Sequence, residues 1–268
     1  MPKDWFEWHD LYNTEAKLQQ RLEIVQEYIS YSLDHSPIGA IRVVSVCAGD
    51  GRDLLGTLAN HPRTKDVYAR LVEINPGLVE RGRATIESLG LTKQIEFING
   101  DATAADNYVG AVPADIVIVC GIFGNLADEN ELNRLLGNLS FLSKKGTFVL
   151  WTRGHSNGIA YSETVRKYFR DFGFEEVNFK LTATGDMGVG IHRYLGEHLP
   201  TPKEEELFVS CYTAKLYNPN ILNSCLTGKM PVPLIQIKCT TAYFLAFQIK
   251  RDKKWPLQAL PYPVGNNY

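Results

Sequence analysis

The feature that most constrains the fold is residues 41–55, IRVVSVCAGDGRDLL, where an apolar run passes into a Gly-x-Gly turn and then into a helix-forming segment. Such a run of β-branched residues is typical of a strand buried on both faces of a parallel sheet. Gly49 and Gly51 allow a sharp turn and a close approach of the backbone to a ligand. Free N–H groups at the start of the next helix would face that ligand. The stretch predicts the ligand-binding first loop of an α/β fold.

Later apolar runs end in polar residues at a matching spacing. Glu73 lies at the end of the run 67–74, twenty-two residues after Gly51, and Asp101 follows the run 94–98. The run 115–120 passes into the segment GIFGN. A carboxylate at the end of a parallel strand can accept hydrogen bonds from ribose hydroxyls. A dinucleotide-binding loop would need a third glycine where Leu54 stands, so the spacing opposes a nicotinamide-dependent oxidoreductase.

With these motifs the chain resembles the class I S-adenosylmethionine (SAM)-dependent methyltransferases, and within them a bacterial subfamily of uncharacterised proteins. The motifs that carry the resemblance lie within residues 4–208 and are Trp5-x-x-Trp8-His9, Cys47-Ala-Gly-Asp-Gly-Arg-Asp53, Leu71-Val-Glu-Ile74, Gly121-Ile-Phe-Gly-Asn125 and Trp151-Thr-Arg153. Cys47 replaces the acid that usually lies two residues before the first glycine, and Asp53 replaces the usual third glycine. The contact of that acid with the methionine amino group would then fall to Asp50 or to backbone carbonyls.

The resemblance implies an α/β fold with a doubly wound, Rossmann-like, seven-stranded sheet, mostly parallel with an antiparallel C-terminal hairpin. The apolar pattern predicts where its elements lie. Later strands are expected at 67–74, 94–98, 115–120, 147–152, 174–181 and 188–195, and helices at 53–59, 76–89, 128–142 and 161–172. The predicted domains are an N-terminal helical lid (1–38), a SAM-binding core (39–202) and a C-terminal extension of unclear structure (203–268).

The resemblance also implies the cofactor contacts. The first loop would run against the methionine part of SAM, Glu73 would accept from the ribose, and Asp101 with the Ala102 N–H would meet the adenine. The carbonyls of residues 120–122 would lie near the methionine amine. The full predicted set is Ala48, Gly49, Asp50, Gly51, Glu73, Ile74, Asp101, Ala102, Cys120, Gly121 and Ile122. Two alternatives stay open, a solvated loop acid for Glu73 and a helix N-cap for Asp101.

The N-terminal segment 4–35 is expected to form one long helix or a broken pair of helices. Trp5, Trp8, His9 and Tyr12 recur at helical spacing and put an aromatic face before a conventional aliphatic stripe. This face suits either core packing or a lid over the cofactor and acceptor pocket. A flat or cationic acceptor would stack well on such rings.

Methyl transfer depends mainly on the position and desolvation of the nucleophile, and a base is needed only for a protonated acceptor. The residues expected at the acceptor end, and therefore the candidate catalytic residues, are His9, Tyr12, Arg153 and His155. Arg153 could hold an acceptor carboxylate or phosphate in a bidentate fork, or form a salt bridge at the rim of the sheet. A histidine on such a face is more often a hydrogen-bonded structural residue than a base, and this alternative stays open for His9.

The composition limits which binding partners and which cellular compartment are expected. The formal net charge of −2 argues against a general nucleic-acid binder. Five cysteines without regular spacing indicate a reducing compartment. The sequence contains no Cys-x-x-Cys pair and no histidine cluster, so no metal site is expected. The first residues lack the apolar core of a signal peptide, and the apolar run 241–249 is too short to span a membrane. A cytoplasmic protein without a membrane partner is therefore expected, and the sequence leaves the oligomeric state open.

The leading hypothesis is a SAM-dependent methyltransferase that acts on a small molecule. A second hypothesis is a SAM- or adenosylhomocysteine-binding module without catalysis, because the first loop departs from the usual pattern and no base is certain. A nucleic-acid methyltransferase is opposed by the mild acidity and by GIFGN at the place where a nucleobase amino-methylase would carry Asn-Pro-Pro-Tyr or Asp-Pro-Pro-Tyr.

Overall fold

The computed structural model describes residues 5–126, 128–155, 161–203 and 205–209, with the side chain of Trp5 excepted. The expected place of the Trp5 ring and nearly all of the C-terminal extension therefore lie outside the described residues. None of the helices in this part of the chain has the length and apolar content needed to cross a bilayer.

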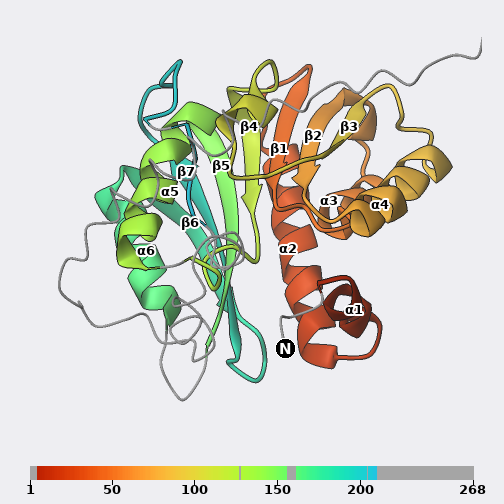
Figure 1. Ribbon diagram of the computed structural model, residues 1–268, viewed down its shortest axis with the longest axis horizontal. Helices are drawn as coiled ribbons and strands as arrows, with labels where there is room; N and C mark the ends of the chain where they lie inside the picture. The colour runs from red at the N-terminus through yellow and green to blue at the C-terminus, as the bar shows by residue number, and fades with distance from the viewer. Residues whose placement is uncertain (1–4, 127, 156–160, 204, 210–268) are drawn as a thin grey trace, which may run out of the picture. The chain divides into compact units, whose positions relative to one another are not determined.

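The protein is built on one seven-stranded sheet with strand order β3-β2-β1-β4-β5-β7-β6 (Figure 1). The strands are β1 (Ile41–Val46), β2 (Val67–Glu73), β3 (Ile95–Asn99), β4 (Ala114–Val119), β5 (Ser143–Gly154), β6 (Phe174–Leu181) and β7 (Met187–Tyr194). The first five pair in parallel, and β7 lies antiparallel between β5 and β6. The predicted fold class is confirmed, including the antiparallel C-terminal hairpin.

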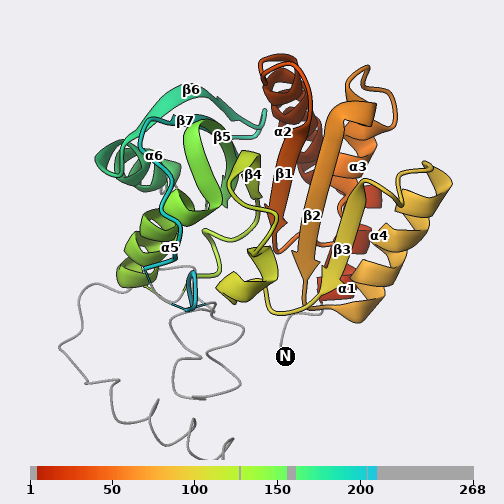
Figure 2. The same ribbon diagram turned by 90° about the horizontal axis from the view of Figure 1, so that it is seen from above.

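Helices cover both faces of the sheet. They are α1 (Trp5–Asp10), α2 (Ala16–Asp34), α3 (Arg52–Leu58), α4 (Pro76–Ser88), α5 (Glu129–Leu142) and α6 (Tyr161–Asp171), with short 3₁₀ turns η1 (Leu11–Asn13), η2 (Thr64–Asp66) and η3 (Ala105–Tyr108). One apolar cluster joins α2, α3 and α4 to the sheet, and another joins η3, α5 and α6 to its opposite face (Figure 2). This two-sided burial explains why β4 is buried along its whole length and apolar except for Asp115.

Local sequence sets where several helices begin. Asn75 caps α4 by accepting from the N–H groups of Gly77 and Leu78, and Pro76 takes the first helical position. Asp128 caps α5 in the same way, accepting from Asn130 N at 2.8 Å. At the N-terminus η1 separates α1 from α2, so the broken pair of helices forms rather than one long helix.

The fifth strand is longer than predicted, because it runs from Ser143 to Gly154 rather than from 147 to 152. Ser143 pairs with Ala114 and Phe148 with Ile116, so β5 contains the extra residues of a bulge, and the Thr147 hydroxyl donates to the Ala114 carbonyl at 2.6 Å. The residues 144–146 look like a polar turn in the sequence, but this side-chain bond and the bulge keep them in the strand. Residues 205–209 also pack closely, since Leu207 and Phe208 are buried in the cluster formed by η3, α5 and α6.

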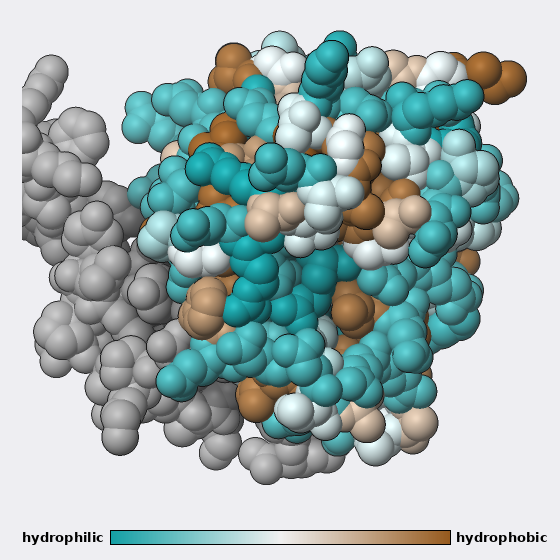
Figure 3. Space-filling model, turned by 90° about the vertical axis from the view of Figure 1, so that its right-hand side faces the viewer, coloured by the Kyte–Doolittle hydropathy of each residue, from teal (hydrophilic) through white to brown (hydrophobic). Residues whose placement is uncertain are grey.

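The carboxyl ends of the parallel strands point toward α1, as the β2 arrowhead shows in Figure 2. On the side of the molecule that carries α4, Figure 3 shows a mostly hydrophilic surface with separate small hydrophobic groups. Such scattered apolar exposure is normal for a folded domain.

Because the carboxyl ends of the strands point toward α1, the predicted site residues meet between these strand ends and the N-terminal helices.

A buried histidine links β5 to β7 in the core. Trp151 Nε1 donates a hydrogen bond to His192 Nδ1 at 3.0 Å, so the imidazole carries its proton on Nε2, which lies 3.6 Å from a Glu176 carboxylate oxygen. Burial lowers the pKa of His192 to about 4, against the opposing attraction of Glu176. The core therefore holds this histidine neutral at pH 7.

We expect the free energy of unfolding to fall as the pH is lowered from 6.5 to about 4. In this range the unfolded chain protonates His192, whose ordinary pKa is 6.5, whereas the folded protein does not. The contribution of His192 to this decrease in the free energy of unfolding should reach about 1.4 kcal/mol per pH unit. Urea unfolding as a function of pH would measure it. His192→Gln should reduce the slope, because glutamine can accept from Trp151 without titrating, and an unchanged slope would contradict the assignment.

Candidate functional site

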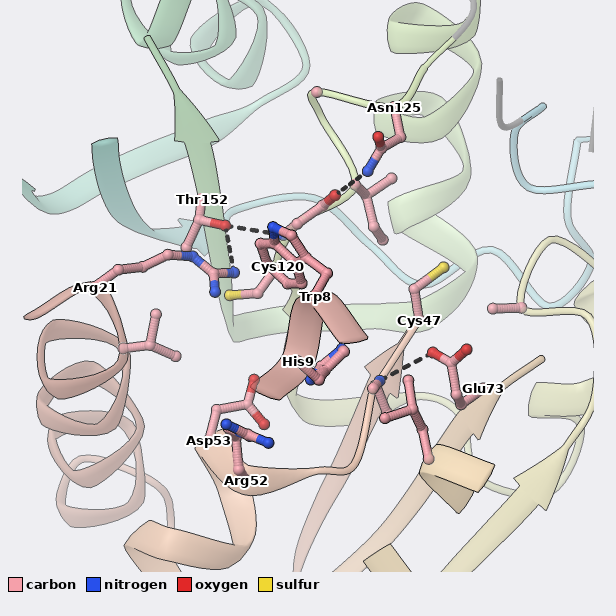
Figure 4. A pocket seen from close by; sticks show the side chains of 18 of the residues that line it. Trp8, His9, Arg21, Cys47, Arg52, Asp53, Glu73, Cys120, Asn125 and Thr152 are labelled. Carbon is pink, nitrogen blue, oxygen red and sulfur yellow. Dashed lines mark hydrogen bonds between the residues drawn. The ribbon is translucent and has the colours of Figure 1, made fainter. Parts of the chain in front are cut away.

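A cavity of about 320 Å³ opens at the carboxyl ends of the parallel strands. Its walls come from the ends of β1, β2, β3, β4 and β5 and the loops that follow them. Residues of α1, η1 and α2 complete the lining. Figure 4 shows Arg21 and Glu73 on opposite sides of this cavity, with Trp8 and His9 between them. A pocket at this edge of a doubly wound sheet is where ligands bind in such folds.

The loop after β1 forms one wall by alternating its backbone conformation. Cys47, Gly49 and Gly51 have φ angles of +53°, +60° and +73°. Cys47 is the only non-glycine residue with positive φ in the described part of the chain. The turn is closed by the Gly51 N–H, which donates to the Ala48 carbonyl at 2.9 Å. Three left-handed residues in alternation turn the loop tightly enough to present its backbone to the cavity.

Glu73 is fixed at the end of β2 by this loop. Its side chain is 8% exposed, and its carboxylate accepts hydrogen bonds from Gly49 N at 3.0 Å and Asn75 N at 2.9 Å. Burial raises the pKa of Glu73, while the backbone hydrogen bonds act in the opposite direction. The carboxylate is therefore held by two backbone donors and retains lone pairs for a ligand.

The Asp101 side chain caps a turn and not a helix, since the next helical residues begin at Ala105. Its Oδ1 accepts from the Thr103 backbone N–H at 2.9 Å and from the Thr103 hydroxyl at 2.8 Å, so it caps the turn after β3. It is exposed and also lines the cavity, next to the buried Ala102. The capping bonds fix the carboxylate without using its second oxygen.

The aromatic residues of α1 and η1 lie over the first loop. Trp8, His9 and Tyr12 form one cluster, in which the Trp8 ring meets the other two edge-on at 5.4 and 5.3 Å between ring centroids. The His9 ring lies directly on Gly49, because a Cβ atom added to this glycine would overlap the ring. Tyr12 is 5% exposed, and the Arg52 guanidinium lies 4.9 Å from its ring centroid. This cluster lines the cavity together with the strand ends.

His9 is neutral in this environment. Burial lowers its pKa to about 4, opposed by Asp50 and assisted by the nearby arginines, with Arg52 the strongest of them. Its Nδ1 lies 3.9 Å from Asp50 Oδ1 and has no hydrogen-bond partner among the described residues. A neutral imidazole can accept a proton or a hydrogen bond at pH 7, although a pKa this low makes it a weak base.

Not every predicted site residue lines the cavity. Asp50 is 5% exposed and holds Arg52 through two hydrogen bonds of 2.8 and 2.5 Å, and Gly51 is the N-cap residue of α3. His155 also lies outside the cavity lining, with Nε2 2.7 Å from the Ser162 hydroxyl and Nδ1 3.0 Å from the Gly185 carbonyl. Both ring nitrogens of His155 therefore have partners, one on α6 and one in the turn between β6 and β7. The other predicted residues lie together in the lining, namely His9, Tyr12, Ala48, Gly49, Glu73, Ile74, Asp101, Ala102, Cys120, Gly121, Ile122 and Arg153.

Arg21 is a cavity residue that the sequence analysis missed. It lies on α2 at 7% exposure, and its Nη2 donates to the Thr152 hydroxyl at 2.9 Å (Figure 4). Its Nε is buried without a hydrogen-bond partner, and no carboxylate of the described residues lies within 4.0 Å of it. Burial lowers the pKa of Arg21. Its signal in the sequence is an arginine that interrupts the aliphatic stripe, three residues after Leu18 and four before Val25.

Asp53 is a second cavity residue that was not among the predicted site residues. It lines the cavity at the start of α3, on the same side as Arg21 and Arg52 in Figure 4. Its Oδ1 accepts from the Leu54 N–H at 2.8 Å, and burial raises the pKa of its carboxyl group. The sequence showed it only as a departure from the usual third glycine of the loop.

Comparison with known proteins identifies the family. A family model described as "Putative methyltransferase" matches residues 8–156, which is more than half of the chain. The chain belongs to this methyltransferase family. The chain is also 29% identical over 115 residues to "Uncharacterized protein YnbC" of Escherichia coli (strain K12). That match covers 42% of the chain and only 19% of the length of the Escherichia coli protein.

Several solved structures have a fold similar to that of this chain. An O-methyltransferase family protein from Burkholderia thailandensis has a TM-score of 0.52 at 19% identity, covering 66% of this chain and 56% of that one. The CurJ carbon methyltransferase gives 0.57 at 12% identity, over 72% and 59% of the two chains. Magnesium protoporphyrin IX methyltransferase of Synechocystis PCC 6803, solved with bound SAM, gives 0.52 at 12% identity, over 72% and 98%. These similarities confirm the expected class I methyltransferase fold.

Proposed function

We propose that the protein is a SAM-dependent methyltransferase whose acceptor is a small molecule. The observation that carries the proposal is the Glu73 carboxylate, which is held against the Gly49 N–H inside a cavity at the carboxyl end of the sheet. A buried carboxylate with free lone pairs suits the two vicinal hydroxyls of a ribose. Family membership and the presence of SAM in a structural neighbour support the same cofactor.

The residues of the cavity fit the parts of SAM. Glu73 and Ile74 would hold the ribose, and Asp101 with Ala102 the adenine. Gly49 and Ala48 would contact the methionine chain, whose carboxylate would pair with Arg21. The carbonyls of residues 120–122 and the Asp53 carboxylate would accept from its amino group. Asp50 and Gly51 would act indirectly, by holding Arg52 and by shaping the loop.

SAM supplies a methyl group on a cationic sulfur, which is already a good leaving group. The protein then has to position the acceptor and remove water from the path. Trp8 and Tyr12 would cover the cavity, and Arg153 would orient the acceptor. His9, neutral at pH 7, could accept a proton from a nucleophile of low pKa. His155 remains a candidate only if the β5–α6 region rearranges, since both of its ring nitrogens have partners.

The lid also supports the small-molecule acceptor over a nucleic acid. The aromatic cluster narrows the cavity next to the first loop, and the formal net charge of the chain is −2. A polymer substrate would need an open basic groove beside the reacting atoms. Incubation of the protein with labelled SAM and a metabolite extract would test turnover. A protein that binds SAM but transfers no label to small molecules would favour the binding module, and label transferred to nucleic acid instead would contradict the acceptor class.

Glu73→Ala should weaken binding of S-adenosylhomocysteine (SAH) by about 2 kcal/mol, or roughly 30-fold. The variant loses the carboxylate that would accept from the ribose. Titration calorimetry would measure the affinity, with Glu80→Ala as a control because Glu80 is an exposed acid on the neighbouring helix α4. Unchanged affinity in a folded Glu73→Ala protein would remove this residue from the site.

Arg21→Met should weaken binding of SAH roughly tenfold, the loss of a charge-assisted hydrogen bond of about 1.5 kcal/mol. The affinity for 5′-methylthioadenosine, which keeps the nucleoside but has no carboxylate, should stay the same. Calorimetry with the two ligands separates the effects. An equal loss for both ligands would mean that Arg21 only supports the shape of the cavity.

A further inference from the structure

The cavity contains a second arginine without an anionic partner. Arg153 lies near the end of β5 and lines the cavity. No carboxylate of the described residues lies within 4.0 Å of it, and its only hydrogen bond there runs from Nη1 to the Gly154 carbonyl at 2.9 Å. Its Nε is buried without a partner. Burial lowers the pKa of Arg153, which means that the protein bears a cost for keeping this charge.

The surroundings of Arg153 hold its guanidinium in place and leave two of its nitrogens without a partner. The Tyr161 ring lies on the guanidinium, with 4.5 Å between Cζ and the ring centroid. Gly124 lies on the Nη1 side, where an added Cβ would come within 3.2 Å of that nitrogen. Neither Nε, which is buried, nor Nη2 has a hydrogen-bond partner among the described residues. Two parallel N–H groups of this kind match the two oxygens of a carboxylate or a phosphate.

The groups of SAM would leave this arginine without an ion-pair partner. SAM carries one carboxylate, one ammonium and one sulfonium group, so it has only one anionic group. This carboxylate would be taken by Arg21, which lies across the cavity from Glu73 (Figure 4). The acids Glu73, Asp101 and Asp53 would meet hydroxyl and amino donors of the cofactor. Arg153 would then remain unpaired in the cavity, and an anionic group on the second ligand would supply its partner.

We infer that the methyl acceptor is a small aromatic acid whose carboxylate or phosphate group is bound by the Nε–Nη2 edge of Arg153. The aromatic part is indicated by the other lining residues near the lid, the rings of Trp8 and Tyr12 and the side chain of Met187. Flat rings pack well against such surfaces. Arg153 binds the non-reacting end of the acceptor and thereby sets which atom faces the methyl group. The inference rests on the proposed function, because it takes SAM as the cofactor.

The experiment uses the full-length protein saturated with SAH and measures binding of benzoate, phenyl phosphate and benzamide by calorimetry. Benzamide matches benzoate in shape but carries no charge. At least one of the two anions should bind ten or more times more tightly than benzamide. Arg153→Met should abolish this preference and leave the affinity for SAH unchanged. Arg153→Lys should keep part of it, because lysine supplies the charge but not the planar fork.

Arg193→Met is the matched control. Arg193 also lies over a ring, 4.9 Å from the Phe148 centroid, and its Nε is also buried without a partner, but it does not line the cavity. This variant should keep the preference for the anion. If the protein binds SAH, three results would overturn the inference. They are equal binding of the anions and benzamide, no binding of either anion, and a preference for the anion that persists in Arg153→Met. Failure of the wild-type protein to bind SAH would instead remove the proposed function and the inference together.

Discussion

Gly49→Ala is expected to reduce the affinity for SAH about 100-fold, because it disturbs two parts of the site at once. The added Cβ would overlap the His9 ring and push the lid away from the first loop. Gly49 has a φ of +60°, so alanine would also shift the backbone N–H that donates to Glu73 at 3.0 Å. Calorimetry would measure the affinity, and the intensity of tryptophan fluorescence would report movement of the lid.

Gly90→Ala is the control that separates the overlap with the His9 ring from the strain of an alanine at positive φ. Gly90 follows α4 with a φ of +70°, and an added Cβ would meet no atom within 4 Å. Both alanine variants should lose about 1–2 kcal/mol of stability from the left-handed conformation. Only Gly49→Ala should lose SAH binding. If the two variants bound SAH equally well, the first loop would not form the cofactor site.

Tyr12→Ala is expected to open the N-terminal lid. Tyr12 is 5% exposed, and its ring contacts the rings of Trp8 and His9 and the Arg52 guanidinium, which lies 4.9 Å from its centroid. Loss of a buried aromatic ring costs about 3 kcal/mol or more, so hydrogen-exchange protection of residues 6–20 should fall roughly 100-fold. The strands of the sheet should keep their protection, since Tyr12 belongs to neither of its two apolar clusters.

Tyr12→Phe keeps the ring and removes only the hydroxyl, so it should preserve the protection of the lid. SAH binding should weaken in Tyr12→Ala and not in Tyr12→Phe, because the open lid admits water to the cavity. Equal protection in the alanine variant and the wild-type protein would show that Tyr12 does not hold the lid. Loss of protection throughout the sheet would show that the lid and the core unfold as one unit.

Much of the fold follows from the sequence alone. Apolar runs such as 115–120 predict buried parallel strands, and the glycines at 49 and 51 predict the turn after β1, because these signals depend on neighbouring residues. The position of Glu73 follows for the same reason: an acid at the end of an apolar strand lies at the carboxyl edge of the sheet. The predicted start of β5 is four residues late, because its first residues depend on a bulge in β5 opposite β4 and on the Thr147 hydroxyl.

The sequence by itself therefore determined the class I fold, the order of its elements and the residues at the strand ends. Only the tertiary structure decided which side chains share the cavity. It brings Arg21 from α2 to Thr152 on β5, 131 residues away, and it places His155 against Ser162 instead of in the cavity. It also places the His9 ring on Gly49. Such contacts depend on how helices pack on a sheet, and the local pattern of residues does not encode that packing.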